Sequence, residues 1–406
     1  MENFFKNTLF RCAFIMVQFI FIGFSNAQLY YSMFLEHEYN SNPFGFPESK
    51  DDQISRISMG IQKDWENVSM QYFGSYLNYK NFTLRNFYWH QAFLAYTGEK
   101  TNWSLTAENR IDRSDYNIYD YFSVRGGFNH TIPVNKFIWR INGLVTLNTF
   151  QNFSELNNLY FSANTSFNRS FPTRTTLIGS ATLNLKSYLK KYNDLIIPED
   201  SVSTLNYSHS MILNPEGNGP GQGYGDKGRG DYNYYLPEDE NLLISQLFLS
   251  LRIAQSLTNY TGIALQYQGR LNFNKQDRSV AGIMHGYTAE SQIFDDPMGY
   301  QGYTLGAELT QLIPYQVSIK SAVYHQRKNY ISQGIYIDDE IFDDSTLRKD
   351  KYQTVWVTIE KRFSLFKSEY SSFSLQLSYQ WILNNSNSYW YDYNSQNFSG
   401  SIQVDL

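Results

Sequence analysis

The stretch SFSLQLSYQWIL, Ser372–Leu383, determines the predicted fold class, because polar and apolar side chains alternate along it. From Phe373 to Trp381 every second residue is leucine or aromatic, and the residues between them are serine or glutamine. A period of two is the pattern of a β-strand whose two faces meet different surroundings. Since roughly ten residues let a tilted strand cross a bilayer, the stretch predicts a membrane-spanning β-strand.

The same alternation recurs along the chain, most clearly at 245–253 and 261–271. It divides the residues from 28 onward into about sixteen predicted strands, whose ends are defined to within about two to four residues. The strands are expected at 29–40, 54–65, 67–79, 87–97, 102–112, 119–130, 136–150, 158–169, 174–188, 241–256, 260–273, 301–312, 315–328, 351–363, 370–383 and 397–406.

The connections between these strands alternate between short turns and long insertions. The long ones fall at 41–53, 189–240, 274–300, 329–350 and 384–396. Outer-membrane barrels have short turns at the periplasmic rim and long loops at the external rim. The pattern therefore predicts an all-β fold, a transmembrane antiparallel up-and-down β-barrel of about sixteen strands (range about 14–18), with short periplasmic turns and long external loops. A β-propeller would repeat about every 40–50 residues, and no such repeat is visible.

Residues 1–27 have the pattern of a cleaved secretory signal. Lys6 and Arg11 supply positive charge, a mostly apolar run follows, and small residues at 25–27 precede Gln28. The apolar run is shorter than the ~20 residues of a membrane-spanning helix. The sequence therefore predicts export, cleavage before Gln28, and a single barrel domain at 28–406.

The composition fits such a barrel. The chain has 34 Tyr and 30 Phe, and Tyr and Trp favour the level where lipid meets water. The formal net charge is −5, or −6 without the signal, which argues against a nucleic-acid partner. The one cysteine, Cys12, lies in the predicted signal, so the mature chain is expected to have no disulfide, thiolate metal site or cysteine nucleophile.

These features resemble bacterial outer-membrane barrels, and porin-like barrels in particular, without pointing to a specific family. The last strand, 398–406, is similar to the C-terminal signal that barrel-insertion machinery reads, although it ends in Leu406 rather than an aromatic residue. The resemblance implies the outer membrane of a Gram-negative-type bacterium, contact with outer-membrane lipid and lipopolysaccharide, and recognition by the insertion machinery. A homo-oligomer is left open.

If the apolar face meets lipid, the polar face lines a lumen. Nine basic and four acidic residues are expected there, which predicts a net-basic channel that favours anions. The alternative is an interior filled by Arg–Glu pairs, such as Glu108 with Arg110 or Glu360 with Arg362. The predicted lumen-lining charges are Glu36, Arg56, Glu108, Arg110, Arg125, Arg140, Lys186, Arg252, Arg270, Glu308, Lys320, Glu360 and Arg362.

The loops offer weaker candidate sites. The Gly-rich loop 189–240 is expected to be external or to fold into the lumen. The aromatic residues Tyr232, Tyr234, Tyr235, Trp390 and Tyr391 could contact glycans, or they could belong to the interfacial aromatic girdle. An acidic group could hold Ca²⁺ but has no EF-hand spacing, so a solvated loop, bridged to lipopolysaccharide by divalent ions, is the alternative. The acidic group is Asp338, Asp339, Glu340, Asp343 and Asp344.

No catalytic motif is present, since the six histidines are scattered and none has metal-ligand spacing. We therefore expect no enzyme, no cofactor and no resident metal. Two hypotheses remain from the sequence: a porin-like channel for passive diffusion of small polar or anionic solutes, and a plugged barrel for glycan capture, secretion or adhesion. A third, an outer-membrane hydrolase, would need a catalytic pair to converge at the outer rim.

Overall fold

The computed structural model describes residues 28–113, 117, 120–152, 154–189, 243–275, 277, 295–339, 341–365 and 371–406. The predicted signal at 1–27 and nearly all of the predicted loop 189–240 lie outside the described residues. No helix in the described residues is long and apolar enough to span a membrane.

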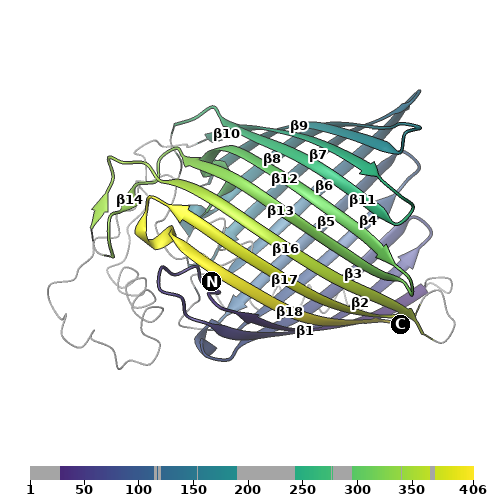
Figure 1. Ribbon diagram of the computed structural model, residues 1–406, viewed down its shortest axis with the longest axis horizontal. Coiled ribbons are helices and arrows are strands. Elements are labelled where there is room, and N and C mark those ends of the chain that lie inside the picture. Colours follow the sequence, from purple (N-terminus) through teal and green to yellow (C-terminus); the bar gives the residue numbers. More distant parts are fainter. Residues whose placement is uncertain are drawn as a thin grey trace.

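Sixteen antiparallel strands form one closed barrel, and this confirms the predicted all-β fold (Figure 1). Each strand pairs with its neighbours in sequence, and β1 pairs with β18 to close the wall. The strands are β1 Gln28–Asn40, β2 Asp52–Trp65, β3 Val68–Tyr79, β4 Phe87–Thr97, β5 Thr101–Asp112, β6 Tyr121–Val134, β7 Phe137–Phe150, β8 Asn158–Ser170, β9 Thr175–Tyr188, β10 Leu243–Ser256, β11 Thr261–Asn272, β12 Tyr300–Ile313, β13 Val317–Tyr330, β16 Lys349–Ser364, β17 Ser372–Ser386 and β18 Tyr393–Asp405.

The two ends of the barrel differ as the sequence predicts. Short turns join the strands at one end, and the long connections gather at the other (Figure 1). Several short turns contain residues in the left-handed backbone conformation, for example Asn135 with φ 50° and Arg174 with φ 61°. By analogy with outer-membrane barrels we call these ends periplasmic and external.

The register gives each strand an outward and an inward face. On β17 the outward residue Leu377 is 63% exposed, while the inward Ser372 is 4% exposed. Strand β4 follows the same rule, with Tyr88 and Leu94 facing outward and Phe87 facing inward. The alternation that predicts the strands therefore separates a mostly apolar outer wall from an inner wall that holds most of the charged residues of the strands.

Three local features differ from the prediction, and one is that β6 continues to Val134, four residues past its predicted end. Strand β18 begins at Tyr393, four residues before the predicted start, because its first residues pair with β17. The external connection between β13 and β16 contains a small hairpin, β14 Ile335–Tyr336 and β15 Phe342–Asp343, within a predicted loop. Short 3₁₀ turns also occur in the external connections: η1 Thr83–Arg85, η3 Ser154–Leu156, η6 Pro297–Gly299 and η7 Tyr389–Tyr391.

Candidate transport lumen

All the predicted lumen charges lie on one face of the sheet, opposite the exposed apolar side chains. Residues directly opposite each other on neighbouring strands point to the same side. Following these partners around the closed wall places the whole predicted set, from Glu36 to Arg362, on the inward face.

The predicted set was incomplete, and the register does not support a net-basic lumen. Seven further charged residues share the inward face, and six of them are acidic. The strands thus carry ten basic and ten acidic inward residues. Asp52 and Asp350 lie beyond the predicted strand ends, and the other five lie within predicted strands but outside the predicted set of lumen charges. The additional residues are Glu38, Asp52, Asp64, Asp112, Lys328, Asp350 and Asp405.

The predicted Arg–Glu pairs within one strand are wrong. Arg110 instead donates to Asp112 at 2.8 Å, and both side chains are buried. Glu108 accepts hydrogen bonds from Tyr121 and, at 3.3 Å, from Gln91. Arg362 donates to the hydroxyl of Ser372 at 2.9 Å, and among the described residues it forms no ion pair with Glu360. A spacing of two residues places an arginine and a carboxylate on the same face of a strand. It does not determine whether the arginine pairs with the carboxylate before it or with the one after it.

An ion pair lies partly exposed on the inner wall, close to the periplasmic end. Arg252 on β10 contacts Glu308 on β12 at 2.6 Å, across the small residue Ala264 of β11. Tyr324 also donates to Glu308 at 2.6 Å. The two charges are 32% and 22% exposed and line a recess of about 150 Å³. A solute moving along this wall would meet both signs of charge together.

At the external end an apolar cluster fills part of the barrel interior. Phe44 and Phe46 from the β1–β2 connection and Phe82 from the β3–β4 connection pack against inward residues of the wall. Phe44 lies 4.7 Å from Phe82, edge to face, and 5.9 Å from Tyr79, measured between ring centres. These two external connections therefore fold inward over the mouth. The cluster is Phe44, Phe46, Ile54, Leu77, Tyr79, Phe82, Phe87, Tyr121, Phe150, Leu156, Tyr188, Ile244 and Met298.

A second inward-folded element is the segment 295–299, just before β12. Asp296 forms a buried ion pair with Lys186 on β9, and Asp295 forms another with Lys328 on β13 at 2.5 Å. Three strands separate β9 from β13, so the two lysine backbones lie about 19 Å apart along the wall, at about 4.8 Å per strand. Two consecutive aspartates can reach both lysines only from inside the curve of the wall.

The same segment is also held by wall amides. The side-chain amide of Gln246 donates to the backbone oxygens of Pro297 and Tyr300, at 2.8 and 3.1 Å. Asn272 donates to the backbone oxygen of Met298 at 2.8 Å. These hydrogen bonds and the two ion pairs hold segment 295–299 across part of the external mouth. We call this segment the inner bridge.

A third buried group lies beside β16 and centres on Arg348. It shows that one of the predicted glycan contacts, Tyr391, is wrong. Tyr391 is 2% exposed, and the guanidinium carbon of Arg348 lies 3.2 Å from the centre of its ring. Arg348 pairs with Asp350 and donates to Gln333 at 3.0 Å. Tyr391 is therefore a packing residue and not a surface contact for a glycan. Trp390 lies beside Tyr389, edge to face at 5.2 Å.

The described carboxylates of the acidic loop do not gather into a metal site. Among the described residues no group of three or more potential ligands could hold a metal ion, and Glu340 lies outside them. Asp338 accepts from the backbone of Ile341 at 2.7 Å. Hydrogen bonds from Ser345 and Thr346 lower the pKa of Asp343 to about 2. These carboxylates are thus partly occupied by their own loop. The candidate residues Tyr232, Tyr234 and Tyr235 lie outside the described residues.

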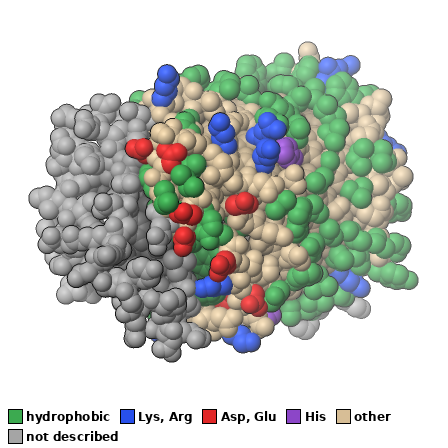
Figure 2. Space-filling view, turned by 60° about the vertical axis from the view of Figure 1, so that its left-hand side comes forward, with side chains coloured by type: hydrophobic (Ala, Val, Ile, Leu, Met, Phe, Trp, Pro, Cys, Tyr) green, Lys and Arg blue, Asp and Glu red, His purple; other side chains and the backbone are tan. Residues whose placement is uncertain are grey.

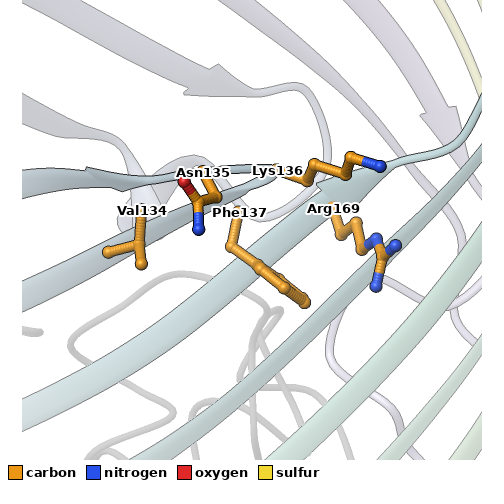
Figure 3. A pocket seen from close by; sticks show the side chains of 5 residues that line it. All are labelled: Val134, Asn135, Lys136, Phe137 and Arg169. Carbon is orange, nitrogen blue, oxygen red and sulfur yellow. The ribbon is translucent and has the colours of Figure 1, made fainter.

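Another pocket lies away from the lumen. It has a volume of about 510 Å³ and surrounds the periplasmic turn between β6 and β7 (Figure 3). Val134 and Phe137 belong to the outward face, and Arg169 stacks on Phe137 at 4.8 Å. The pocket is a feature of the periplasmic rim and gives no reason to place solute binding there. Its lining residues are Val134, Asn135, Lys136, Phe137 and Arg169.

Comparisons with known proteins relate the chain to others by fold. No family model and no curated protein matches the sequence. Among solved structures, the outer membrane protein OpdK from Pseudomonas aeruginosa has a TM-score of 0.50 at 7% identity, covering 93% of this chain and 99% of that one. OccAB1 from Acinetobacter baumannii has a TM-score of 0.49 at 8% identity, covering 94% and 97%. The chain therefore has the fold of a porin-like outer-membrane β-barrel, without placement in a specific family.

Proposed function

We propose that the protein is a porin-like channel through which small polar solutes cross the outer membrane by passive diffusion. The observation that carries the proposal is the sorting of side chains by a closed sixteen-stranded wall, apolar outside and polar inside. A barrel of this size is wide enough for an aqueous passage unless inserted segments fill it. The proposal assigns the protein no catalytic residue and no cofactor.

Selectivity in this proposal comes from width and from the arrangement of charge. The inward strand charges balance, so the field that would favour anions over cations is weak. The inner bridge and the apolar cluster narrow the external mouth and set the upper size of solute. The exposed pair of Arg252 and Glu308 offers a donor fork and an acceptor side by side, which suits polar or zwitterionic solutes.

Liposome swelling tests this function. Refolded mature protein is placed in liposomes, which are then diluted into isotonic solutions of neutral sugars and amino acids of increasing size. The proposal predicts rapid swelling with the smallest solutes and a steep decrease as size rises. Swelling no faster than in protein-free liposomes, from a barrel shown to be folded by its heat-modifiable gel mobility, would reject it.

A second candidate function is a plugged barrel that binds a partner at the cell surface. The observation in its favour is the apolar cluster at the external mouth, which includes residues from four external connections. Under this reading the lumen passes no solute, and the external surface carries the activity. The same swelling experiment separates the two, because a plugged barrel gives no uptake at any solute size.

A further inference from the structure

The outward face of the barrel carries a strongly one-sided distribution of charge. On the outward face of the sixteen described strands there is no Asp or Glu, whereas six basic side chains lie there. Three are at the periplasmic end, each near an aromatic ring, such as Lys361 at 4.7 Å from the ring centre of Phe363. The other three, Arg327, Lys349 and Lys351, gather on two adjacent strands at the external end.

The register makes these three residues a single cluster, which we call the outer basic cluster. Arg327 on β13 lies directly opposite Lys351 on β16, and Lys349 follows two residues along on the same face. Residues directly opposite each other have Cβ atoms about 5 Å apart, and like charges in that position destabilise a sheet. On the inward face the next pair is complementary, since Lys328 is opposite Asp350.

Nothing in the described part of the chain neutralises the cluster. Arg327, Lys349 and Lys351 are exposed and make no ion pair there. None of their directly opposite outward neighbours is acidic: Tyr303 is opposite Arg327, Asn329 is opposite Lys349, and Asn385 is opposite Lys351. His325, two residues before Arg327 on the same face, is also not acidic. In Figure 2 basic side chains lie on the outer wall, between the acidic side chains near the external rim and the green apolar wall.

The position of the cluster relative to the apolar wall indicates what surrounds it. Val323 lies four residues from Arg327 on the same strand and face and is 49% exposed, while Leu305 on β12 is 48% exposed. Apolar side chains at this exposure meet lipid tails. A basic side chain costs about 2–4 kcal/mol at mid-membrane but about 0–1 kcal/mol near the interface. The cluster is thus at the level of lipid headgroups.

We propose that the outer basic cluster binds the phosphate groups of an outer-leaflet lipid headgroup. A phosphate placed between Arg327 and Lys351 relieves their repulsion, and the guanidinium fork matches two phosphate oxygens. Lys349 and the neighbouring amides supply further donors. The apolar wall below receives the acyl chains of the same molecule, which a free phosphate ion lacks.

Native mass spectrometry of the refolded protein in uncharged detergent tests the proposal, with bisphosphorylated lipid A as the probe. Each basic side chain near an anionic lipid surface contributes about a fivefold gain in binding, so Arg327→Gln with Lys351→Gln weakens binding about 25-fold. Lys361→Gln, an outward lysine at the periplasmic end, is the matched control and leaves binding unchanged. Lipid A stripped of its phosphates binds the unaltered protein as weakly as the double variant binds the intact lipid.

Three results would overturn the proposal. They are equal lipid binding by the double variant, equal binding of the dephosphorylated lipid, and full displacement of the lipid by millimolar inorganic phosphate, which would indicate a free-anion site. Without lipid, the double variant should melt no lower than the unaltered protein, because the substitution removes a like-charge pair. If the double variant does not fold, Lys351→Gln alone is used, and a loss of about fivefold is expected.

Discussion

For single residues, the charge distribution on the inner face of the barrel depends on which charged side chains form ion pairs with each other. The sequence places Glu108, Arg110 and Arg252 on the correct face, because the face follows from the period of two. It could not select their partners. Arg110 has Glu108 two residues before it and Asp112 two residues after it, and it forms its ion pair with Asp112. The partner of Arg252 comes from β12, two strands away in the wall, and only the register reveals it.

The exposed pair in the lumen should control ion selectivity. Glu308→Gln removes a negative charge beside Arg252 and should move the reversal potential in a salt gradient toward anion preference. Arg252→Gln should move it the opposite way by a similar amount. The double substitution should return it close to the starting value, since it removes both charges. Shifts in the same direction for the two single variants would contradict a role of this pair in the solute path.

Arg348 should be important for stability. Its side chain is 1% exposed, pairs with Asp350 and is enclosed by the rings of Tyr330 and Tyr391. Arg348→Met leaves Asp350 as a buried charge with a weaker partner, and removing one side of such a pair costs about 3–5 kcal/mol. Urea unfolding in detergent micelles, followed by tryptophan fluorescence, should show that loss. Asp339→Asn, in the exposed loop, is the control and should have little effect.

At the scale of elements, strands are predictable from sequence and inward-folded loops are not. The alternation in Ser372–Leu383 is local, so it identifies β17 without knowledge of the neighbours. The contact of Phe44 with Phe82 joins different connections. The inner bridge likewise depends on Lys186 and Lys328, which are far from it in sequence. Such contacts leave no periodic pattern in the sequence, so the inward folding of these connections cannot be predicted from it.

Releasing the inner bridge should widen the channel. Asp295→Asn with Asp296→Asn removes both buried ion pairs, so the segment loses its attachment to Lys328 and Lys186. We expect a larger single-channel conductance and more current noise than in the unaltered protein. Asp344→Asn, a substitution in the exposed acidic loop, should leave both unchanged. An unaltered conductance in a folded double variant would show that the bridge does not border the solute path.

At the scale of the whole molecule, closure of the sheet explains the sorting of residues. Strand β1 meets β18, and the amide of Leu406 donates to the backbone oxygen of Tyr31 at 2.8 Å. A closed sheet has no free edge, so the backbone N–H and C=O groups of every strand can form hydrogen bonds within a membrane. The total of sixteen strands follows from counting alternating segments. The sequence does not predict the balance of inward charge, because acidic residues such as Asp52 and Asp350 lie at or beyond the predicted strand ends.

Export should remove the first 27 residues. The small residues before Gln28 fit signal cleavage at that bond, so intact mass measurement of protein from the outer-membrane fraction should give a chain beginning at Gln28. Ala27→Asp places a charge where the peptidase requires a small residue and should leave the longer precursor. A mature mass that still includes residues 1–27 would show that the segment is retained.

The most direct test of an aqueous lumen is the single-channel conductance of refolded protein, residues 28–406, in a planar bilayer with a salt gradient. An open lumen with balanced charge predicts steady steps on the nanosiemens scale and a reversal potential close to zero. A demonstrably folded barrel that passes no current would contradict the account, and the plugged surface-binding barrel would then take its place.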